Sequence, residues 1–578
     1  MFRRIGAPIL LVGLFMFERP VTAAEHPVDA ISSDAGVVVR LKSPQNTIGK
    51  VADFVDQVVP GFGQQVRAQG TAIGLLISNP TLAGVNQEAD WWLAVYPKPG
   101  DQPPEVVYII PSTDLKAMKE ALGDSQKFIE LGTFGIYTDD ADAADRTAAL
   151  LKGTGKSIHE TAEKPSVELF EKGDLSVYLN VRRLTTLYKE VLTESRERLA
   201  QQLENVPEEI PGTPGVNPKA LAEMVGQVVN VLMQGLDDTQ SITIAMQISK
   251  EGITFEDLVR FAADSKTDKL LQKSPPSSLD NLGKLPAGNL GYLGLKGDLT
   301  ELMQYGTKML ATAKPGDANK DLQATIGEMQ KLKFGSIASA FGLGSVEEGA
   351  IRSVTVTEVN EPTKARDLTR RLFKAMGTME TGGIKQTYDM KADAEKHGQN
   401  VADVVTVKTE LGDLGDPTAS EMLDRFMKAL YGPEGMVTRS VYLKDKMVQT
   451  AGGGKGALDQ ALATLESNKD SAGTADSFQK ARGRLGEKAN VVVLFDLPMT
   501  IARAVSVVAE GNILPPNIPI TSDMFKNLDL QPSFLGFSAS TEPQGLRLKT
   551  SIPVEQAQGV AKLVQTVMLL QAGGGLQQ

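Results

Sequence analysis

The feature that most constrains the fold is a local order that recurs along the chain: a short strand, one or two amphipathic helices, a β-hairpin and another helix. In its clearest occurrence, residues 175–179 alternate as a strand and residues 183–205 carry apolar side chains at helical spacing. Two further alternating strands, 242–248 and 253–261, are joined by a short turn. Gly252 closes that turn and supplies the positive φ that tight hairpins favour.

The same order returns near the C-terminus. Residues 491–495 form the strand, residues 514–519 form a proline-rich connection, and residues 534–540 and 546–552 form the hairpin. Both units place a proline-rich segment between strand and hairpin, and both hairpin turns carry a Glu followed shortly by a Gly. Two matching irregularities in matching order indicate duplication more strongly than periodicity alone.

We therefore predict an α+β fold made of tandem duplicated modules, with mostly antiparallel sheet and helices packed on one face. Looser versions of the unit begin near residues 36 and 289, so each module should hold a pair of units. The expected division is a first module pair at 25–275, a Pro/Ser-rich linker at 276–285 and a second module pair at 286–578.

Residues 1–24 are typical of a secretory signal peptide. Arg3 and Arg4 are followed by an apolar stretch at 5–17 and by small residues that end at Ala24, where we expect cleavage. No later stretch reaches 18 uninterrupted apolar residues, so we expect no transmembrane segment after cleavage. The chain is predicted to be exported, to the periplasm or the extracellular space, as a soluble protein.

Composition excludes several kinds of site. The chain has no cysteine, which removes disulfides, thiolate metal sites and cysteine nucleophiles. Its histidines are only His26, His159 and His397, too few for a multi-histidine metal centre. A net charge of −11 and an aromatic content of 5 % argue against nucleic-acid binding, which rewards basic and stacking residues.

Three glycine-rich runs resemble phosphate or dinucleotide loops without completing them. The run 153–157 lacks the first P-loop glycine, because Leu150 stands at that position, and a helix-like stretch precedes it. The run 342–344 lacks the third glycine of a dinucleotide fingerprint. We interpret the run 153–157 as a helix end and a flexible link, and we assign no dinucleotide site to the run 342–344. The run 452–456 is interpreted as a turn, with anion binding as the alternative.

Acidic and histidine clusters also favour structural roles. Four aspartates within 139–145 lie at an expected helix start, where they cap the helix, and the segment lacks the glycine and glutamate of a calcium loop. His159 lacks the second histidine of a zinc-protease helix. Asp393, Glu395 and His397 are interpreted as a polar surface loop.

Trp91 and Trp92 are the only tryptophans and lie in an expected strand. Because neighbouring strand residues face opposite sides, one should enter the core and the other should be half-covered, with a binding patch as the alternative.

The overall layout resembles the large exported proteins of unknown function found in planctomycetes and some cyanobacteria. The resemblance rests on the signal peptide, on the start of the mature domain at residues 30–40, and on the repeated units with turns such as 249–252. That family implies no activity, cofactor or site residue.

The sequence contains no recognisable catalytic constellation, so we assign no catalytic, cofactor-binding or metal-binding residue and expect no cofactor. The leading hypothesis is a non-enzymatic extracytoplasmic binding or scaffolding protein whose partner is an envelope protein or peptide. The alternative is an extracytoplasmic hydrolase that uses carboxylates or Ser/Lys, whose residues would converge only in the fold. Carboxylates of raised pKa in a pocket would favour the hydrolase. An exposed apolar patch would favour the binding protein.

Overall fold

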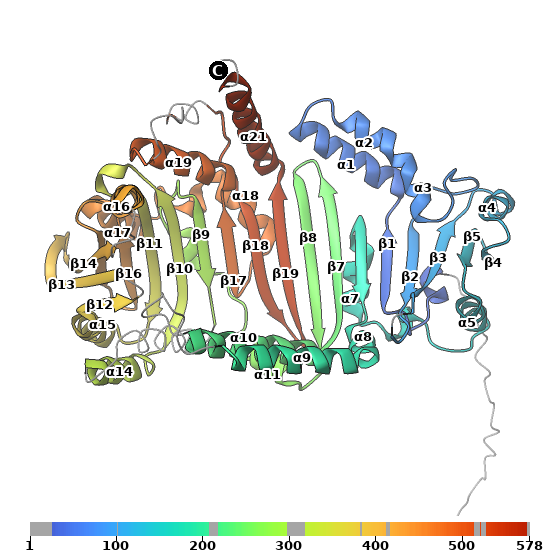
Figure 1. Ribbon diagram of the computed structural model, residues 1–578, viewed down its shortest axis with the longest axis horizontal. Helices are drawn as coiled ribbons and strands as arrows, with labels where there is room; N and C mark the ends of the chain where they lie inside the picture. The colour runs from blue at the N-terminus through green and yellow to red at the C-terminus, as the bar shows by residue number, and fades with distance from the viewer. Residues whose placement is uncertain are drawn as a thin grey trace, which may run out of the picture.

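The computed structural model describes residues 26–100, 102–206, 218–297, 318–381, 384–411, 417–513, 521 and 528–574. Within these residues, 19 strands form one sheet in which every pairing between strands is antiparallel, and helices surround it (Figure 1). The fold class is therefore α+β, as predicted. The strands are β1 (Val37–Leu41), β2 (Trp91–Tyr96), β3 (Glu105–Pro111), β4 (Lys127–Leu131), β5 (Phe134–Thr138), β6 (Leu175–Leu179), β7 (Thr239–Ser249), β8 (Gly252–Phe261), β9 (Gly291–Leu295), β10 (Phe334–Leu343), β11 (Ile351–Val359), β12 (Thr378–Thr381), β13 (Ile384–His397), β14 (Asn400–Leu411), β15 (Met436–Tyr442), β16 (Lys446–Ala451), β17 (Val491–Phe495), β18 (Leu535–Glu542) and β19 (Gly545–Pro553).

Along the chain, the helices lie between the strands or between pairs of strands. They are α1 (Pro44–Val58), α2 (Gly63–Gln69), α3 (Ile73–Leu76), α4 (Leu115–Leu122), α5 (Ala141–Leu151), α6 (Ile158–Thr161), α7 (Lys164–Lys172), α8 (Val181–Leu187), α9 (Lys189–Glu204), α10 (Pro218–Asp238), α11 (Lys266–Gln272), α12 (Asp280–Gly283), α14 (Ala318–Met329), α15 (Pro362–Met376), α16 (Pro417–Tyr431), α17 (Gly454–Ser467), α18 (Asp476–Leu485), α19 (Leu497–Glu510) and α21 (Val554–Gly574). Four short 3-10 turns complete the described elements: Pro27–Ala30, Gly70–Ala72, Val346–Glu348 and Ala472–Thr474. None of the described helices is long and apolar enough to span a bilayer.

The strands follow one another across the sheet in the order β4-β5-β3-β2-β1-β6-β7-β8-β19-β18-β17-β9-β10-β11-β16-β15-β14-β13-β12. The two halves of the chain meet where β8 pairs with β19, so the sheet runs through both of them without a break (Figure 1). The order β5-β3-β2-β1-β6-β7-β8 on one side of this junction matches the order β16-β11-β10-β9-β17-β18-β19 on the other. Tandem duplication stays our prediction for how this match arose.

The match extends to the register and defines counterparts between the halves. Arg40 is the fourth residue of β1 and pairs with Trp92 of β2. Gly294 is the fourth residue of β9 and pairs with Ala338 of β10. Arg40 and Gly294 are therefore counterparts, and so are Trp92 and Ala338.

The central strands bury one face and leave the other half-buried. The buried face packs against α7, α12 and α18, and we call it the covered face. Along β1, for example, Val38 and Arg40 point to the covered face and are buried, whereas Val37, Val39 and Leu41 point to the other face and are half-buried. We call that second face, over β1, β6, β7, β8, β19, β18, β17 and β9, the open face.

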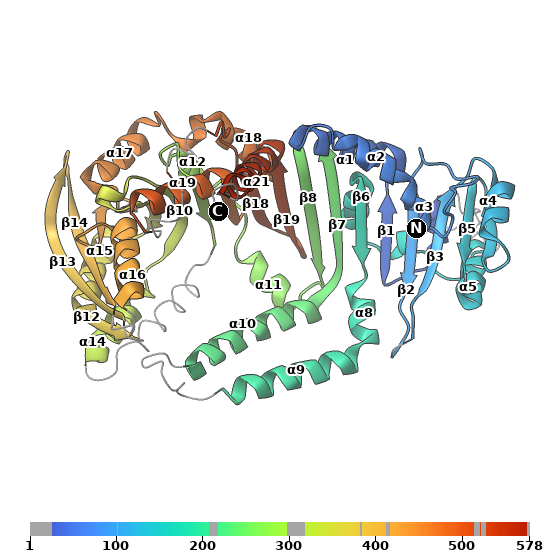
Figure 2. The ribbon, with the colours of Figure 1, turned by 45° about the horizontal axis from the view of Figure 1, so that its top comes forward.

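The two ribbon views show which helices lie around the open face. In Figure 1 the middle of strands β18, β19, β8 and β7 is not crossed by any described helix, with α19, α21 and α1 above and α9 to α11 below. In Figure 2, α9 and α10 stand away from the sheet on one side, while α12, α17 and α18 lie on the other. The chain thus forms a wide sheet. Helices pack against its covered face, whereas the described helices lie only along the edges of its open face.

Several predictions fall outside the described residues or need correction. The signal peptide expected at 1–24 and the proline-rich connection expected at 514–519 lie outside the described residues. Residues 276–285, expected as a linker, contain α12, and both Leu279 and Leu282 are buried there. The edge strands β4 and β12 were not predicted.

Candidate functional site

The open face is apolar across the middle of the sheet. One row of register partners runs across all eight of its strands, and seven of the eight side chains in the row are aliphatic. The row consists of Val39, Val177, Ile244, Asp257, Leu548, Ala539, Val491 and Leu295, all half-buried. The next row is similar, with Leu41, Leu175, Met246, Phe255, Thr550, Phe537, Val493 and Leu293. A sheet that faces water on one side normally places polar residues there.

Asp257 is the one charged residue in these two rows. Its register partners are Ile244 on β7 and Leu548 on β19, so its carboxylate stands among aliphatic side chains. Burial raises the pKa of Asp257, and the neighbouring charge of Glu256 raises it further. Within the described residues the structure gives the Asp257 side chain no hydrogen bond or ion pair.

The covered face, by contrast, has a polar centre. Glu256 receives a hydrogen bond from Arg547 (2.5 Å) and ion-pairs with Lys172 and Lys549 (3.3 and 3.4 Å). Burial would raise the pKa of Glu256, but the three cations outweigh it and lower that pKa. A buried ion-pair set thus lies within the mainly apolar covered face, while the middle of the open face is apolar except for Asp257 and Thr550.

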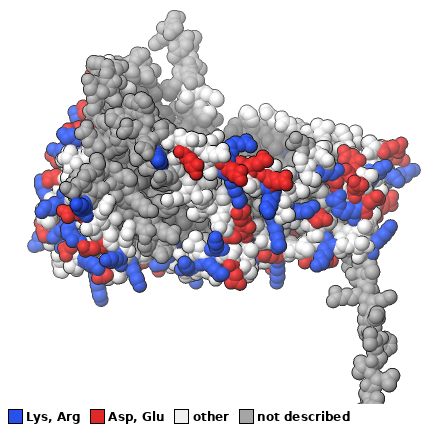
Figure 3. Space-filling model, turned by 60° about the horizontal axis from the view of Figure 1, so that its bottom comes forward, with Lys and Arg blue, Asp and Glu red and all other residues white. Residues whose placement is uncertain are grey.

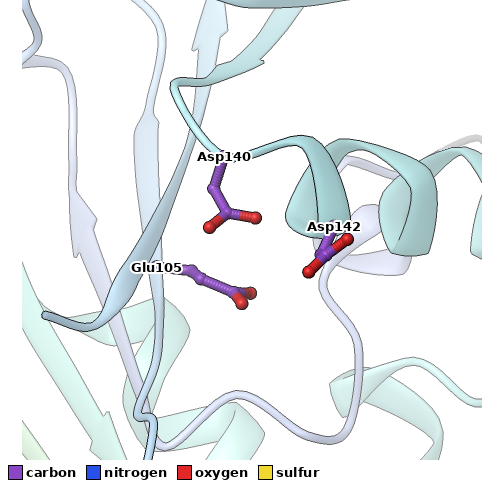
Figure 4. Close-up of side chains that lie close together, drawn as sticks. All are labelled: Glu105, Asp140 and Asp142. Atoms are coloured by element: carbon purple, nitrogen blue, oxygen red, sulfur yellow. The ribbon is translucent and has the colours of Figure 1, made fainter. Parts of the chain in front are cut away.

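A cluster of three carboxylates offers the arrangement of a metal site. Glu105 at the start of β3 faces Asp140 and Asp142 at the start of α5 (Figure 4). Cations already neutralise it, because Lys98 contacts Glu105 and Asp140 at 3.0 and 2.9 Å and Arg146 pairs with Glu105. Asp140 caps α5 by accepting a hydrogen bond from the Ala143 amide, as predicted. We therefore interpret the cluster as an ion-pair network.

A second carboxylate of raised pKa lines a cavity of about 540 Å³ in the C-terminal half. Burial raises the pKa of Asp496, whose oxygens accept hydrogen bonds from the Met499 and Ser533 amides. Asp496 is the N-cap of α19, and Asn180 caps α8 at the corresponding place after β6. The uncharged side chain of Asn180 caps its helix in the same way in the first half of the chain. Capping of α19 is therefore sufficient to explain the presence of Asp496.

The segment around His397 corrects a sequence prediction. We expected a polar surface loop, but Asp393, Glu395 and His397 lie on β13, and the His397 side chain is buried. Its ring nitrogens contact Asp459 (2.8 Å) and Glu395 (3.2 Å), and Arg439 donates to Glu395. The charges that indicated a solvated loop instead satisfy one another between β13, β15 and α17.

Two of the three glycine-rich runs lie at turns or helix ends, as expected, whereas Gly342 and Leu343 belong to β10 and pair with β11. The run 153–157 follows the end of α5, where Gly153 and Gly155 adopt positive φ. Gly453 is the N-cap of α17 and also has positive φ. His159 lies on the short helix α6 and contacts Asp29 at 3.2 Å.

The two tryptophans point to opposite faces, as predicted, but both are buried. Trp91 is 4 % exposed and packs with Met118 and Tyr137, whereas Trp92 is 7 % exposed and packs with Phe170. The expectation that one of them is only half-covered was wrong, because α4 covers the side of β2 that would otherwise be open.

The surface seen in Figure 3 carries Lys/Arg and Asp/Glu side by side over its described part. No protein-family model, curated protein or solved structure matches the chain.

Proposed function

We propose that the protein is a non-enzymatic extracytoplasmic binding protein that holds an apolar, helix-forming protein segment on the open face. The observation that carries the proposal is the pair of apolar rows with the single carboxylate of Asp257. Apolar surface released from water contributes about 25 cal/mol per Å², so a partner that covers these rows gains most of its affinity there.

Asp257 gives this face a charge preference. A carboxylate between Ile244 and Leu548 loses water when a partner covers it, and that loss is offset only by a hydrogen-bond donor or a cation. A basic side chain within the apolar face of the partner supplies both. The proposed partner is therefore an amphipathic protein segment with a Lys or Arg among its apolar residues.

The test uses three helical Leu/Gln peptides that differ at one position in the middle of the leucine face. That position holds Lys, Met or Glu, and binding to the purified protein is measured by fluorescence anisotropy. We expect the Lys peptide to bind about tenfold more tightly than the Glu peptide, as a desolvated charge pair allows. Asp257→Asn should remove the preference, and Asp257→Lys should reverse it.

The matched control is Asp124→Asn, which neutralises an exposed loop carboxylate away from the open face. This variant should keep the peptide preference of the unchanged protein. Absence of binding by all three peptides, or an equal preference in the Asp257→Asn variant, would refute the proposal. Binding of phospholipid vesicles in place of the peptides would assign the face to lipid.

The extracytoplasmic location is tested separately. Expression in the native host, followed by cell fractionation and N-terminal sequencing, should give a protein that begins at Glu25 outside the cytoplasmic membrane. A protein retained in the cytoplasm with its first 24 residues intact would contradict the location and leave the binding proposal standing.

A further inference from the structure

The cavity of about 540 Å³ in the C-terminal half lies on the covered side of the sheet, between its strands and helices α17, α18 and α19. One wall is aromatic, because the rings of Phe478 and Phe534 meet the ring of Tyr292 edge to face, with centroids 5.2 and 5.6 Å apart. Arg352 of β11 and Arg503 of α19 also line the cavity. The cavity has the size of a small-molecule site and combines apolar with basic groups.

Neither arginine of this cavity has a counter-charge. The structure gives neither side chain a hydrogen bond or an ion pair with any described residue. Of the three guanidinium nitrogens of Arg352 only Nε is enclosed, so the two Nη nitrogens are accessible to solvent. Arg503 is exposed. A molecule in the cavity can therefore contact both positive charges.

Two glycines leave room for the Arg352 side chain. A Cβ on Gly344 would overlap Arg352 Nε and Cζ, and a Cβ on Gly453 would lie 3.3 Å from Arg352 Cδ. The guanidinium thus packs closely over the Gly344 backbone, which restricts its orientation. A restricted guanidinium loses less conformational entropy when it binds an anion.

The position of Arg352 is charged in the other half of the sheet as well, with the opposite sign. The register that makes Trp92 the counterpart of Ala338 also makes Glu105 of β3 the counterpart of Arg352. Lys98 and an arginine of α5 neutralise Glu105, whereas no described carboxylate pairs with Arg352. The register partner of Glu105 is a tyrosine and that of Arg352 is a glycine, which leaves more space beside Arg352.

The carboxylates of Asp496 and Glu348 do not neutralise the arginines. Asp496 lines the cavity, but its oxygens accept hydrogen bonds from the Met499 and Ser533 amides. Glu348 does not line the cavity and lies against the start of α17, where a Cβ on Gly454 would meet its carboxylate at 3.1 Å. The start of α17 thus already has a carboxylate beside it, and the two arginines are the positive groups left for a ligand.

From these observations we infer that the cavity between β9, β11 and helices α17 to α19 binds a small organic acid with an aromatic body and one carboxylate. The planar guanidinium of Arg352 matches the two carboxylate oxygens, and Arg503 supplies a second positive charge. The aromatic body lies against Tyr292, Phe478 and Phe534. Because Tyr292 is buried on the covered face, this site is separate from the open face, and the inference is independent of the proposed function.

The experiment compares 3-phenylpropanoate with 3-phenylpropanamide, which lacks the charge, and with acetate, which lacks the ring. Affinities for the purified protein are measured at pH 7 by ligand-observed NMR. We expect 3-phenylpropanoate to bind at least about tenfold more tightly than either of the others, because charge-assisted hydrogen bonds are the stronger ones and the ring buries apolar surface. Arg352→Gln should abolish the preference for the acid over the amide, and Arg503→Gln should reduce it.

Arg371→Gln is the matched control. It removes an arginine charge from α15 in the same half of the chain, where Arg371 pairs with Glu328 (2.7 Å) and does not line the cavity, so the preference should stay unchanged. Circular dichroism shows which variants fold, and the exposed Arg503 supplies the test if Arg352→Gln does not. The inference is overturned if 3-phenylpropanoate does not bind, if it binds no more tightly than the amide or acetate, or if a folded Arg352→Gln or Arg503→Gln protein keeps the full preference.

Discussion

Glu256 and Lys549 are direct partners across the β8–β19 junction, and each is the fifth residue of its strand. The pairs on either side mirror one another, since Gly252 pairs with Pro553 and Arg260 pairs with Gly545. A residue near the start of one strand therefore pairs with a residue equally near the end of the other. Two identical strands pair in this way across the interface of a two-fold symmetric dimer. A continuous sheet results because two similar edges meet with matching register and opposite charge at the centre.

The first prediction concerns this centre. Glu256→Gln removes the carboxylate and leaves Lys549, Lys172 and Arg547 close together without their shared counter-charge. Removing one member of a buried ion-pair set is destabilising, and we expect a loss of about 2–3 kcal/mol in the free energy of unfolding. Urea denaturation followed by circular dichroism measures this loss.

The control is Glu410→Gln. Glu410 pairs with Lys385 at 2.6 Å between two exposed side chains, where ion pairs contribute little to stability. An equal loss in both variants would show that the junction gains nothing from its buried charge set.

The sequence was sufficient for the local elements and insufficient for this junction. The strand expected at 491–495 matches β17, and the hairpin expected at 242–261 matches β7 and β8, because alternation and turn glycines are local signals. The pairing of Glu256 with Lys549 joins residues almost three hundred positions apart, and no local pattern encodes it.

The candidate sites were missed for related reasons. Asp257 lies in a strand whose alternation was recognised in the sequence. Alternation does not show which face of the sheet the helices cover, because that depends on tertiary packing. The cavity beside Arg352 is a space left between elements, and a sequence carries no signal for a space. The position of His397 was misread because its charged partners Asp459 and Glu395 neutralise one another only after β13 and α17 pack together.

The second prediction is a loss of stability in acid that depends on Asp403. Burial would raise the pKa of Asp403, but hydrogen bonds from Arg370 and Arg366 outweigh it and lower the pKa to about 2. A depressed folded-state pKa stabilises the protein above the unfolded value of 3.8, and this contribution disappears as the pH falls towards 2. The contribution is about 2 kcal/mol.

Comparison with Asp403→Asn isolates this contribution from that of other carboxylates. The unchanged protein should be more stable than the variant at pH 7, and the difference should shrink steadily at acidic pH in urea unfolding curves. A difference that stays constant over this range would show that Asp403 does not titrate as described.

The third prediction is that two glycines of the run 452–456 respond in opposite directions to substitution by alanine. Gly452 has a φ of +69°, and a Cβ there would lie 1.9 Å from the Ile351 carbonyl oxygen, whereas Gly456 lies in α17 with nothing within 4 Å. Gly452→Ala should therefore cost more than about 2 kcal/mol of unfolding free energy. Gly456→Ala should stabilise by about 0.5–1 kcal/mol, because alanine is the better helix former. Thermal denaturation of both variants measures these changes in stability. It tests whether the backbone conformation at each glycine decides the effect of the substitution.

The fourth prediction is that Asp257 lowers stability in the free protein. Asp257→Leu replaces a carboxylate between Ile244 and Leu548 by a side chain like its neighbours, and should raise the free energy of unfolding at pH 7 by about 1 kcal/mol. Because burial raises the folded-state pKa of Asp257, protonation favours the folded chain. The unchanged protein should therefore approach the variant in stability as the pH falls through that pKa.

The same variant separates a binding role from a structural one. A carboxylate retained for a partner costs stability and adds selectivity, so Asp257→Leu should be more stable and should bind the Lys and Met peptides with equal affinity. A carboxylate with a structural role would give the opposite stability result: Asp257→Leu would unfold at lower urea concentration at every pH. That outcome, measured alongside the peptide titrations, would remove the charge preference from the proposed partner and leave only the apolar rows as its basis.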